Sequence, residues 1–321
     1  MLYKILIWIF NIAVLVLYLR TTLTYFVYFF TFPNVIIPKD INEKMFWRKV
    51  FDHDPDFRVF CDKLAVKDYA RSILPELACA EVYWRGTDIR DAPAEAFAKP
   101  CIFKPNHTSG LFERLPSGRP DVANLQVLGS RWLRRRHDRV LAQWGYLNVK
   151  PELFLEEDLS ATASTEILDL NLYVFGESVA LIIATLGEKS GNERVGLFDA
   201  TGKPMEAHRK SLPLRKRPLP LPADFKLPVD VTGLCASAVA LAAGKDHLRV
   251  DFMWNGEQLY LCEITVYPGS GFRLFSDPAI NRQMSQLWNL NRSWFLTSRQ
   301  TGWRARYAKW LRYKLEEDER E

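Results

Sequence analysis

Two short apolar runs with alternating polar positions stand out in the last third of the chain. Residues 248–253 (LRVDFM) and 258–266 (QLYLCEITV) are rich in β-branched and aromatic side chains and flank an Asn-Gly pair, a pattern typical of a β-hairpin. Because side chains alternate across a strand, each run projects its polar pair from one face. These pairs are Arg249 with Asp251, and Glu263 with Thr265.

The length of the hairpin loop decides whether the two acids share a face. A two-residue turn would pair Asp251 with Tyr260 and turn Glu263 to the opposite face. A three-residue loop at 254–256, with its glycine in the left-handed region and a bulge after it, pairs Asp251 with Leu259 instead. We predict that loop, and with it a shared face on which two buried carboxylates need a cation. The alternative is an edge hairpin whose acids face water.

Another polar cluster follows the apolar segment 101–103, which predicts a strand that ends at Lys104. The next residues, PNHTSG, form a turn, so an ammonium group and several free backbone amides come together. Proteins hold nucleotide phosphates in this way without a Walker sequence. His107 fits a hydrogen-bonding turn residue better than a catalyst. The glycine-rich turn at 267–271 (YPGSG) similarly permits close approach of backbone to a ligand.

Helical and extended patterns alternate through the rest of the chain. The helical patterns cover residues 41–51, 57–74, 131–144, 231–243 and 279–296, and the extended ones cover 81–84, 152–155, 169–175 and 178–185. The lysines at 63 and 67, one helical turn apart, fit a solvated face. The basic helix at 131–144 predicts a solvated lid, with capture of an acidic substrate as the alternative. The Pro-rich loop at 203–230 predicts a lid or binding loop, otherwise a disordered insertion.

Both ends of the chain have membrane-like patterns. Residues 5–19 are apolar except for Asn11, but fifteen residues fall short of the roughly 20 that span a bilayer. We predict an uncleaved membrane-associated helix, spanning the bilayer or lying in its interface, with a buried core helix as the alternative. Residues 303–314 set aromatic side chains on one stripe with basic ones around it. This pattern predicts an interfacial or partner-docking helix, or one packed on the body.

Composition narrows the function classes further. A chain of 321 residues with 48% hydrophobic residues can bury a sizeable core. The net charge of +5 fits anionic partners such as ATP, acidic glycans or lipid headgroups, and no nucleic-acid signature accompanies it. The five cysteines are odd in number and form no CxxC pair, which indicates reduced thiols in the cytosol and no zinc site.

Five motifs in this order resemble the ATP-grasp superfamily: DKLAVKDY, FKPNHTSG, PELFLEEDL, DLNLYVF and RVDFMWNGEQLYLCEITVYPGSG. The nearest branch is the TupA-like one, associated with surface-polysaccharide biosynthesis, and the resemblance covers about residues 34–290. It implies an α+β ATP-grasp fold in which two subdomains grip ATP between antiparallel sheets. The expected parts are a membrane-associated hydrophobic segment (1–32), an N-terminal helical region (33–97), a lid subdomain (98–158), a catalytic subdomain (159–292) and a basic amphipathic C-terminal helix (293–321).

The resemblance also implies ATP and Mg²⁺ as cofactors and a role for each matched residue. The ATP-binding positions are Lys63, Lys104, the turn residues Asn106, His107, Thr108, Ser109 and Gly110, the hinge residues Glu156, Glu157 and Leu159, and, at the ribose, Asp169. The metal ligands are Asp251, Glu263 and Thr265, the catalytic cations are Arg249 and Lys104, and the acceptor site is lined by Gly269, Ser270 and Gly271.

Three departures from the family pattern affect these roles. Thr265 stands where many ATP-grasp enzymes have an Asn ligand, so a second metal is less well supported. Thr108 replaces a common Gly, which stiffens the phosphate turn. The spacing of 12 residues from Asp251 to Glu263 is one shorter than the family pattern, and the three-residue loop restores the shared face.

The implied function is ATP-dependent carboxylate–amine ligation through an acyl phosphate, joining an amino acid or amine to a surface-polysaccharide sugar acid or precursor. One alternative is a phosphotransferase that acts on a glycan or a lipid-linked sugar. Another is a non-catalytic, membrane-tethered scaffold of polysaccharide assembly. In each case we expect the chain at the cytoplasmic face of a membrane, with a small-molecule or glycan substrate and no nucleic acid.

Overall fold

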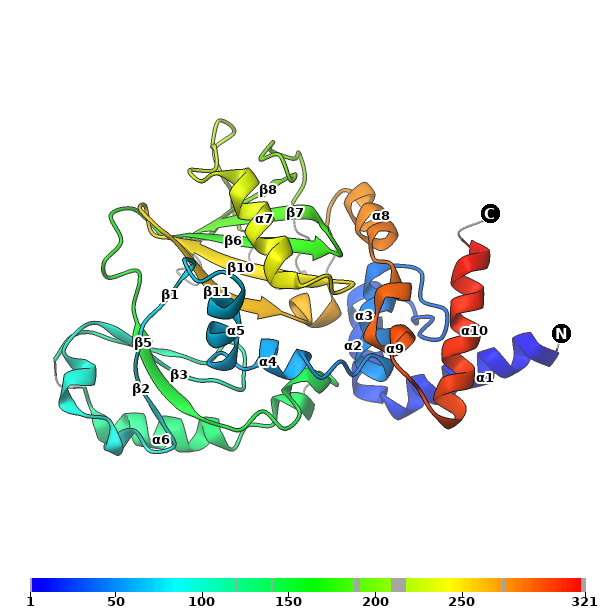
Figure 1. Cartoon of the computed structure of the whole chain (residues 1–321), viewed down its shortest axis with the longest axis horizontal. Helices are drawn as coiled ribbons and strands as arrows, with labels where there is room; N and C mark the ends of the chain where they lie inside the picture. The colour runs from blue at the N-terminus through cyan, green and yellow to red at the C-terminus, as the bar shows by residue number, and fades with distance from the viewer. Residues whose placement is uncertain are drawn as a thin grey trace.

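The computed structural model describes residues 2–118, 120–139, 141–187, 191–208, 218–272 and 275–318. In this part of the chain, two separate β-sheets lie side by side, and a helical cluster stands at one end of the larger sheet (Figure 1). The mixture of helices with mainly antiparallel strands confirms the predicted α+β class.

The larger sheet has seven strands in the order β1-β11-β10-β6-β7-β8-β9. Their bounds are β1 (Ala78–Cys79), β6 (Leu168–Phe175), β7 (Ser178–Leu186), β8 (Arg194–Phe198), β9 (Leu219–Pro220), β10 (Leu248–Trp254) and β11 (Leu259–Thr265). Helix α7 (Val231–Ala242) lies across β6, β7 and β10 (Figure 1). Alternation along β6 and β10 buries Leu170, Leu172 and Val250 completely, and it leaves the polar residues between them on the opposite face.

The smaller sheet has the order β2-β5-β3-β4 and a hydrophobic core of its own. Its strands are β2 (Val82–Gly86), β3 (Cys101–Pro105), β4 (Glu113–Leu115) and β5 (Leu153–Glu157). Helix α6 (Val122–Leu133) packs on it, with Trp132 tilted against Phe103 at 5.2 Å between ring centroids. Because β2 pairs with β5, this sheet takes strands from both sides of residue 98, the start of the lid that the family resemblance implied.

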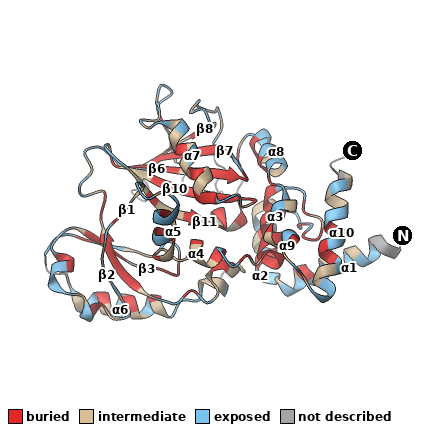
Figure 2. Ribbon diagram, in the orientation of Figure 1, coloured by how far each residue is buried: buried red, intermediate tan, exposed pale blue. Residues whose placement is uncertain are grey.

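The remaining helices are α1 (Leu2–Leu17), α2 (Leu19–Phe29), α3 (Ile41–Phe51), α4 (Phe57–Cys61), α5 (Ala65–Ile73), α8 (Pro278–Leu287), α9 (Trp294–Thr297) and α10 (Gly302–Asp318). Of these helices, α4 and α5 contact β11, and the others gather around the N-terminal and C-terminal segments (Figure 1). Figure 2 shows buried residues concentrated in α3 and the two sheets, and exposed ones along α1, α6 and α10.

Three predicted helices have different bounds in the structure. The helix expected at 279–296 is divided into α8 and α9. The helix expected at 57–74 breaks at Asp62, whose carboxylate accepts hydrogen bonds from the backbone of Leu64 (2.9 Å) and Ala65 (3.3 Å) and so starts a new helix. The helix expected at 131–144 was wrong: α6 begins at its N-cap Asp121 and ends at Leu133, before most of the basic run. Backbone amides that donate to the carboxylates of Asp62 and Asp121 fix where α5 and α6 begin.

No single helix in the described chain is long and apolar enough to cross a membrane. The pair formed by residues 5–17 and 19–29 meets the criterion together, by length and composition, but it is bent by 99°. Val14 and Tyr25 anchor this pair in the main hydrophobic core.

Candidate active site

A cleft of about 590 Å³ opens between the two sheets. One wall is formed by β3, the turn that follows it, and β5 with the segment after it. The other wall is formed by β6, β10 and β11, and residues at the start of α5 close the end between them. Charged side chains from elements far apart in the sequence therefore meet in one space.

The hairpin of β10 and β11 brings Asp251 directly opposite Glu263. The shared face that the sequence predicted is confirmed, but the predicted three-residue loop and the pairing of Asp251 with Leu259 were wrong. Trp254 instead pairs with Leu259, so the loop has four residues, and the side chain of Asn255 accepts hydrogen bonds from within it.

The four-residue loop alone would not set Glu263 opposite Asp251. A β-bulge in β11 brings the two residues into that position. Continued without interruption, the register of Trp254 with Leu259 would set Asp251 opposite Cys262. The register shifts by one residue between Asp251 and Phe252, so that Cys262 is the extra residue and Glu263 moves opposite Asp251. Gly256, in the loop, has the positive φ (+100°) that was expected there.

Arg249 is the cation of this acid pair. Its guanidinium donates to both oxygens of Asp251, at 2.6 and 2.5 Å, and lies 3.7 Å from Glu263 Oε1. The Thr265 hydroxyl lies 3.0 Å from Asp251 Oδ2 and 3.2 Å from Glu263 Oε1, and it also accepts a bond from Arg249. Thr265, the third predicted metal ligand, thus lies within hydrogen-bonding distance of the other two.

The two carboxylates have opposite pKa shifts. Burial raises the pKa of Asp251 to about 7, against the opposing charge of Arg249. Burial alone would also raise the pKa of Glu263, but Lys63 and Arg249 outweigh it and lower the pKa to about 2. Glu263 is therefore ionised throughout the physiological range, whereas Asp251 titrates within it.

Three lysines line the cleft near this pair. Lys63, in the break between α4 and α5, lies 4.0 Å from Glu263 Oε2 and donates to the carbonyl oxygen of Thr108. Lys104, at the end of β3, pairs with the buried carboxylate of Glu156, and Lys67 lies 3.1 Å from the other oxygen of that carboxylate. Two ammonium groups thus share one acid, which leaves positive charge for a phosphate.

The turn after Lys104 divides into a buried part and a part that faces the cleft. The Asn106 side chain donates to Asp62 and to the carbonyl oxygen of Lys150, each at 3.0 Å, and so ties the turn to its surroundings. His107 and Thr108 are buried, whereas Ser109 and Gly110 line the cleft. Gly110 adopts a positive φ of +75°.

The predicted adenine hinge and ribose position lie along the same cleft. Glu156, Glu157, Leu159 and Asp169 all line it. The backbone N–H of Glu157 donates to the carbonyl oxygen of Glu81 at 2.9 Å, so this amide is used within the protein. The role of these residues as an adenine hinge stays a prediction.

The predicted acceptor turn at 269–271 is not among the residues that line the cleft. Gly269, Ser270 and Gly271 all have φ between +56° and +76°. The Ser270 hydroxyl accepts from Gln143 at 3.0 Å, and its carbonyl oxygen accepts from Lys49 at 2.7 Å. These contacts fix the turn in place, and direct contact with a substrate stays a prediction.

The cleft lining also contains residues that sequence reasoning did not assign to the site, and among them are Lys67, Arg114 and Asn171. For two of these residues, the sequence contains a pattern that could have placed them in the site. Lys67 follows Lys63 by four residues, and Asn171 alternates with Asp169 on the strand that pairs with β10. Nothing in the local sequence marks Arg114, which lies on β4.

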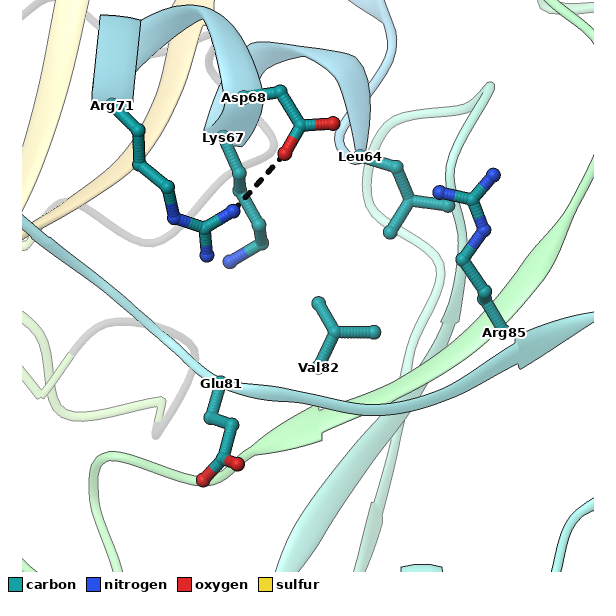
Figure 3. Close-up of a pocket in the computed structure, with 7 residues that line it drawn as sticks. All are labelled: Leu64, Lys67, Asp68, Arg71, Glu81, Val82 and Arg85. Carbon is teal, nitrogen blue, oxygen red and sulfur yellow. Dashed lines mark hydrogen bonds and ion pairs between the residues drawn. The ribbon is translucent and has the colours of Figure 1, made fainter.

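A smaller cavity of about 290 Å³ lies behind Lys67, between α5 and β2 (Figure 3). Arg71 and Asp68 form an ion pair at 3.0 Å on its rim, and Arg85 stands on the far side. This smaller cavity lacks Asp251 and Glu263, so we place the candidate active site in the larger cleft.

The charges of the larger cleft fit a nucleotide bound with a divalent cation. Its lining has seven carboxylates against five cationic side chains, so a polyphosphate alone would meet a surplus of negative charge. No group of three or more His, Cys, Asp or Glu side chains in the described chain is arranged to hold a metal by itself. Mg²⁺ is typically held by one or two carboxylates together with phosphate oxygens, which Asp251 and Glu263 fit.

A family model decides the classification. The TupA-like ATP-grasp model matches residues 43–288, which include every element of the cleft. The chain belongs to the TupA-like ATP-grasp family. This membership confirms the ATP-grasp fold that the five motifs implied. A comparison with curated protein sequences gives no match.

Solved ATP-grasp structures resemble the chain more distantly. D-alanine–D-alanine ligase from Bacillus anthracis in complex with ATP is 13% identical with a TM-score of 0.41, covering 72% of this chain and 65% of that one. L-amino acid ligase from Bacillus licheniformis is 12% identical with a TM-score of 0.42, covering 73% and 50%. ATP-grasp ligase PsnB with a minimal precursor is 13% identical with a TM-score of 0.37, covering 66% and 54%. The chain thus spans less than two thirds of each of these proteins, and the classification rests on the family match.

Proposed function

We propose that this protein is an ATP-dependent carboxylate–amine ligase. The observation that carries the proposal is the position of Asp251, Glu263 and Arg249 in the same cleft as Lys63 and Lys104. Carboxylates for a metal and cations for phosphates are the two requirements of phosphoryl transfer, which is catalysed by positioning and charge stabilisation.

Each group has a defined part in the proposed reaction. A substrate carboxylate oxygen attacks the γ-phosphorus of ATP, the bond to the β,γ-bridging oxygen breaks, and ADP leaves. An amine then attacks the acyl carbon, inorganic phosphate leaves, and the amine loses a proton to solvent. Lys63 and Lys104 hold phosphate oxygens, and Arg249 stabilises charge at the reacting phosphoryl group. Mg²⁺ at Asp251 and Glu263 would neutralise phosphate charge when bound.

We propose further that the substrate is a sugar acid or precursor of a surface polysaccharide, to which an amino acid or amine is joined. This assignment is supported by the TupA-like branch, and it rests on analogy. We place the enzyme at the cytoplasmic face of a membrane, in keeping with its reduced cysteines and its apolar N-terminal helices.

Nucleotide binding is the first test. We expect Mg²⁺–ATP to raise the melting temperature of the wild type, and we expect Lys104→Ala or Glu263→Gln to remove the rise. The matched controls are Lys150→Ala and Glu177→Gln, whose side chains are 83% and 80% exposed and lie outside the cleft lining. Absence of a shift in the wild type would favour the non-catalytic scaffold.

Trapping of the acyl phosphate is the second test. With uronic acids and amino acids offered as carboxylates, we expect ADP release that depends on the carboxylate and yields a hydroxamate when hydroxylamine is present. Lys104→Ala should abolish both products. If a sugar hydroxyl supports ADP release and no hydroxamate forms with any carboxylate, the protein is a phosphotransferase.

A further inference from the structure

The helices α1 and α2 carry an apolar surface that no described residue covers. Of the nineteen exposed large hydrophobic side chains in the described chain, thirteen belong to residues 5–32. Trp8 is 64% exposed, Leu17 is 78% exposed and Phe30 is 82% exposed. We refer to these thirteen exposed side chains as the apolar patch. Concentrations of this kind mark interaction surfaces in folded proteins.

The apolar patch belongs to a fixed part of the fold. The Asn11 side chain accepts from the backbone of Val35 at 2.8 Å and donates to the carbonyl oxygen of Pro33 at 3.2 Å, which ties α1 to the segment after α2. Phe10 packs edge-on against Tyr307 at 5.7 Å, and Tyr28 stacks on Phe272 at 5.1 Å. The apolar side chains are therefore held outward while the opposite side of the helices packs on the body.

Basic and aromatic side chains continue this surface along α10. Trp303 meets Phe10 of α1 edge-on at 5.9 Å, so the two helices are in contact there. From Trp303, a stripe at helical spacing continues through exposed Arg306, Lys309 and Tyr313. Within residues 5–32, the one charged side chain is also basic. Lys and Arg beside apolar and aromatic groups are the composition of interfacial helices.

We propose that the apolar patch and the α10 stripe form a docking surface for an anionic phospholipid bilayer, with α1 and α2 lying in its interface. The bend of 99° between the helices and the anchoring of Tyr25 in the core oppose a straight span. At 1.5 Å per residue, the 16 residues of α1 extend about 24 Å, which is shorter than the hydrocarbon layer.

Charge favours a bilayer over a second copy of the chain. In a twofold dimer the same surface serves both subunits, so the basic stripe would meet either a second basic stripe or the apolar patch, and neither supplies negative charge. Anionic headgroups instead complement Arg306 and Lys309 while the apolar patch enters the acyl boundary. The helical end of the molecule also lies away from the small sheet that forms one wall of the cleft, so docking leaves that wall in water (Figure 1).

Flotation of the full chain with lipid vesicles tests the proposal. We expect binding to vesicles of phosphatidylglycerol mixed with phosphatidylcholine, and much weaker binding to phosphatidylcholine alone. Trp8→Gln combined with Leu17→Gln should weaken binding by about a hundredfold, because insertion of each large apolar side chain contributes about tenfold. Arg306→Gln and Lys309→Gln should each weaken it by about fivefold.

Two exposed residues of α6, far from this end of the molecule, provide matched controls. Val127→Gln removes a large side chain that is 68% exposed, and Arg131→Gln removes an exposed charge. Both should bind vesicles as the wild type does. Circular dichroism and the melting temperature of each variant separate loss of binding from loss of folding, and neither measurement depends on ligase activity.

Three results would overturn the proposal. In the first, the wild type fails to float with anionic vesicles. In the second, the Trp8 and Leu17 double variant floats as well as the wild type. In the third, sedimentation velocity shows a dimer that this double variant dissociates while vesicle binding is absent, which would assign the apolar patch to a second copy of the chain.

Discussion

The ammonium group of Lys67 lies 3.1 Å from the carboxylate of Glu156, and each side chain is less than a tenth exposed. Lys104 pairs with the other oxygen of the same carboxylate. Burial by itself would raise the pKa of Glu156, but Lys104 and Lys67 lower it below its usual value. This contact joins α5 to the last part of β5, and so connects the helix that closes the cleft to the proposed adenine hinge.

Removal of the shared acid should destabilise the protein strongly. Glu156→Gln leaves two ammonium groups without a counter-charge, and breaking a buried pair typically lowers the free energy of unfolding by about 3–5 kcal/mol. Adding Lys67→Met should recover part of this loss, because one unpaired charge is removed. Urea unfolding of Glu156→Gln, of Lys67→Met and of the double variant gives the coupling free energy between the two residues. Purely additive losses would show that Lys67 and Glu156 act independently.

The same pair gives a defined dependence of stability on pH. The pKa of Glu156 is lowered in the folded state, so its stabilisation is present above the unfolded pKa and is lost as the pH falls through the folded value. The loss caused by Glu156→Gln should therefore shrink in acid. A loss that stays constant from neutral pH to acid would contradict the pairing.

Binding of Mg²⁺–ATP should weaken below neutral pH. Burial raises the pKa of Asp251 to about 7, and a proton on this carboxylate competes with the metal. Glu263, with a pKa of about 2, stays ionised in this range. We expect the dissociation constant to rise by up to about tenfold per pH unit below the pKa of Asp251.

The control for this prediction is Asp251→Asn, which cannot titrate at that position. Its weaker binding should retain only the pH dependence of the nucleotide itself. Titration by calorimetry between about pH 5.5 and about pH 8.5 measures both proteins. Parallel curves for the variant and the wild type would show that Asp251 does not control metal binding.

A side chain at Gly256 should destabilise the hairpin loop. A Cβ there would lie 2.7 Å from Thr165 Oγ1 and closer still to Ser164 Oγ, at a backbone φ of +100°. Gly302→Ala is the matched control, because Gly302 has a φ of +57° and open space around it. We expect Gly302→Ala to lower the free energy of unfolding by roughly 1–2 kcal/mol. Gly256→Ala should lower the free energy of unfolding by about 1–3 kcal/mol more than Gly302→Ala does, because of steric strain. Equal losses for the two variants would show that the loop moves to relieve the clash.

The alignment of Asp251 with Glu263, and not the bulge residue itself, should be required for nucleotide binding. Deletion of Cys262 removes the extra residue and leaves an uninterrupted ladder in which Glu263 still lies opposite Asp251. We expect the deletion variant to keep its secondary structure by circular dichroism and its thermal shift with Mg²⁺–ATP. Insertion of one alanine between Cys262 and Glu263 turns Glu263 to the opposite face from Asp251 and should remove the shift. An insertion variant that still responds to Mg²⁺–ATP would show that Glu263 is not a metal ligand.

The sequence alone determined the parts of this protein that local patterns encode. Alternation identified the strands of the hairpin, and the order of the five motifs predicted the ATP-grasp fold that the family match confirms. The residue types at Lys104, Asp251 and Glu263 were enough to predict phosphate and metal chemistry. These features depend on the period of side chains along a strand and on the charge of single residues, which can be read without a partner.

Only the tertiary structure decided how distant segments meet. The sequence predicted a shared face for Asp251 and Glu263 through a three-residue loop, whereas a four-residue loop and a bulge produce it. The neighbouring strands fix that register, since β10 also pairs with β6 and β11 also pairs with β1. Lys67 looked solvated because its partner Glu156 lies far away in the chain. Register and burial depend on contacts between segments, so no local pattern contains them.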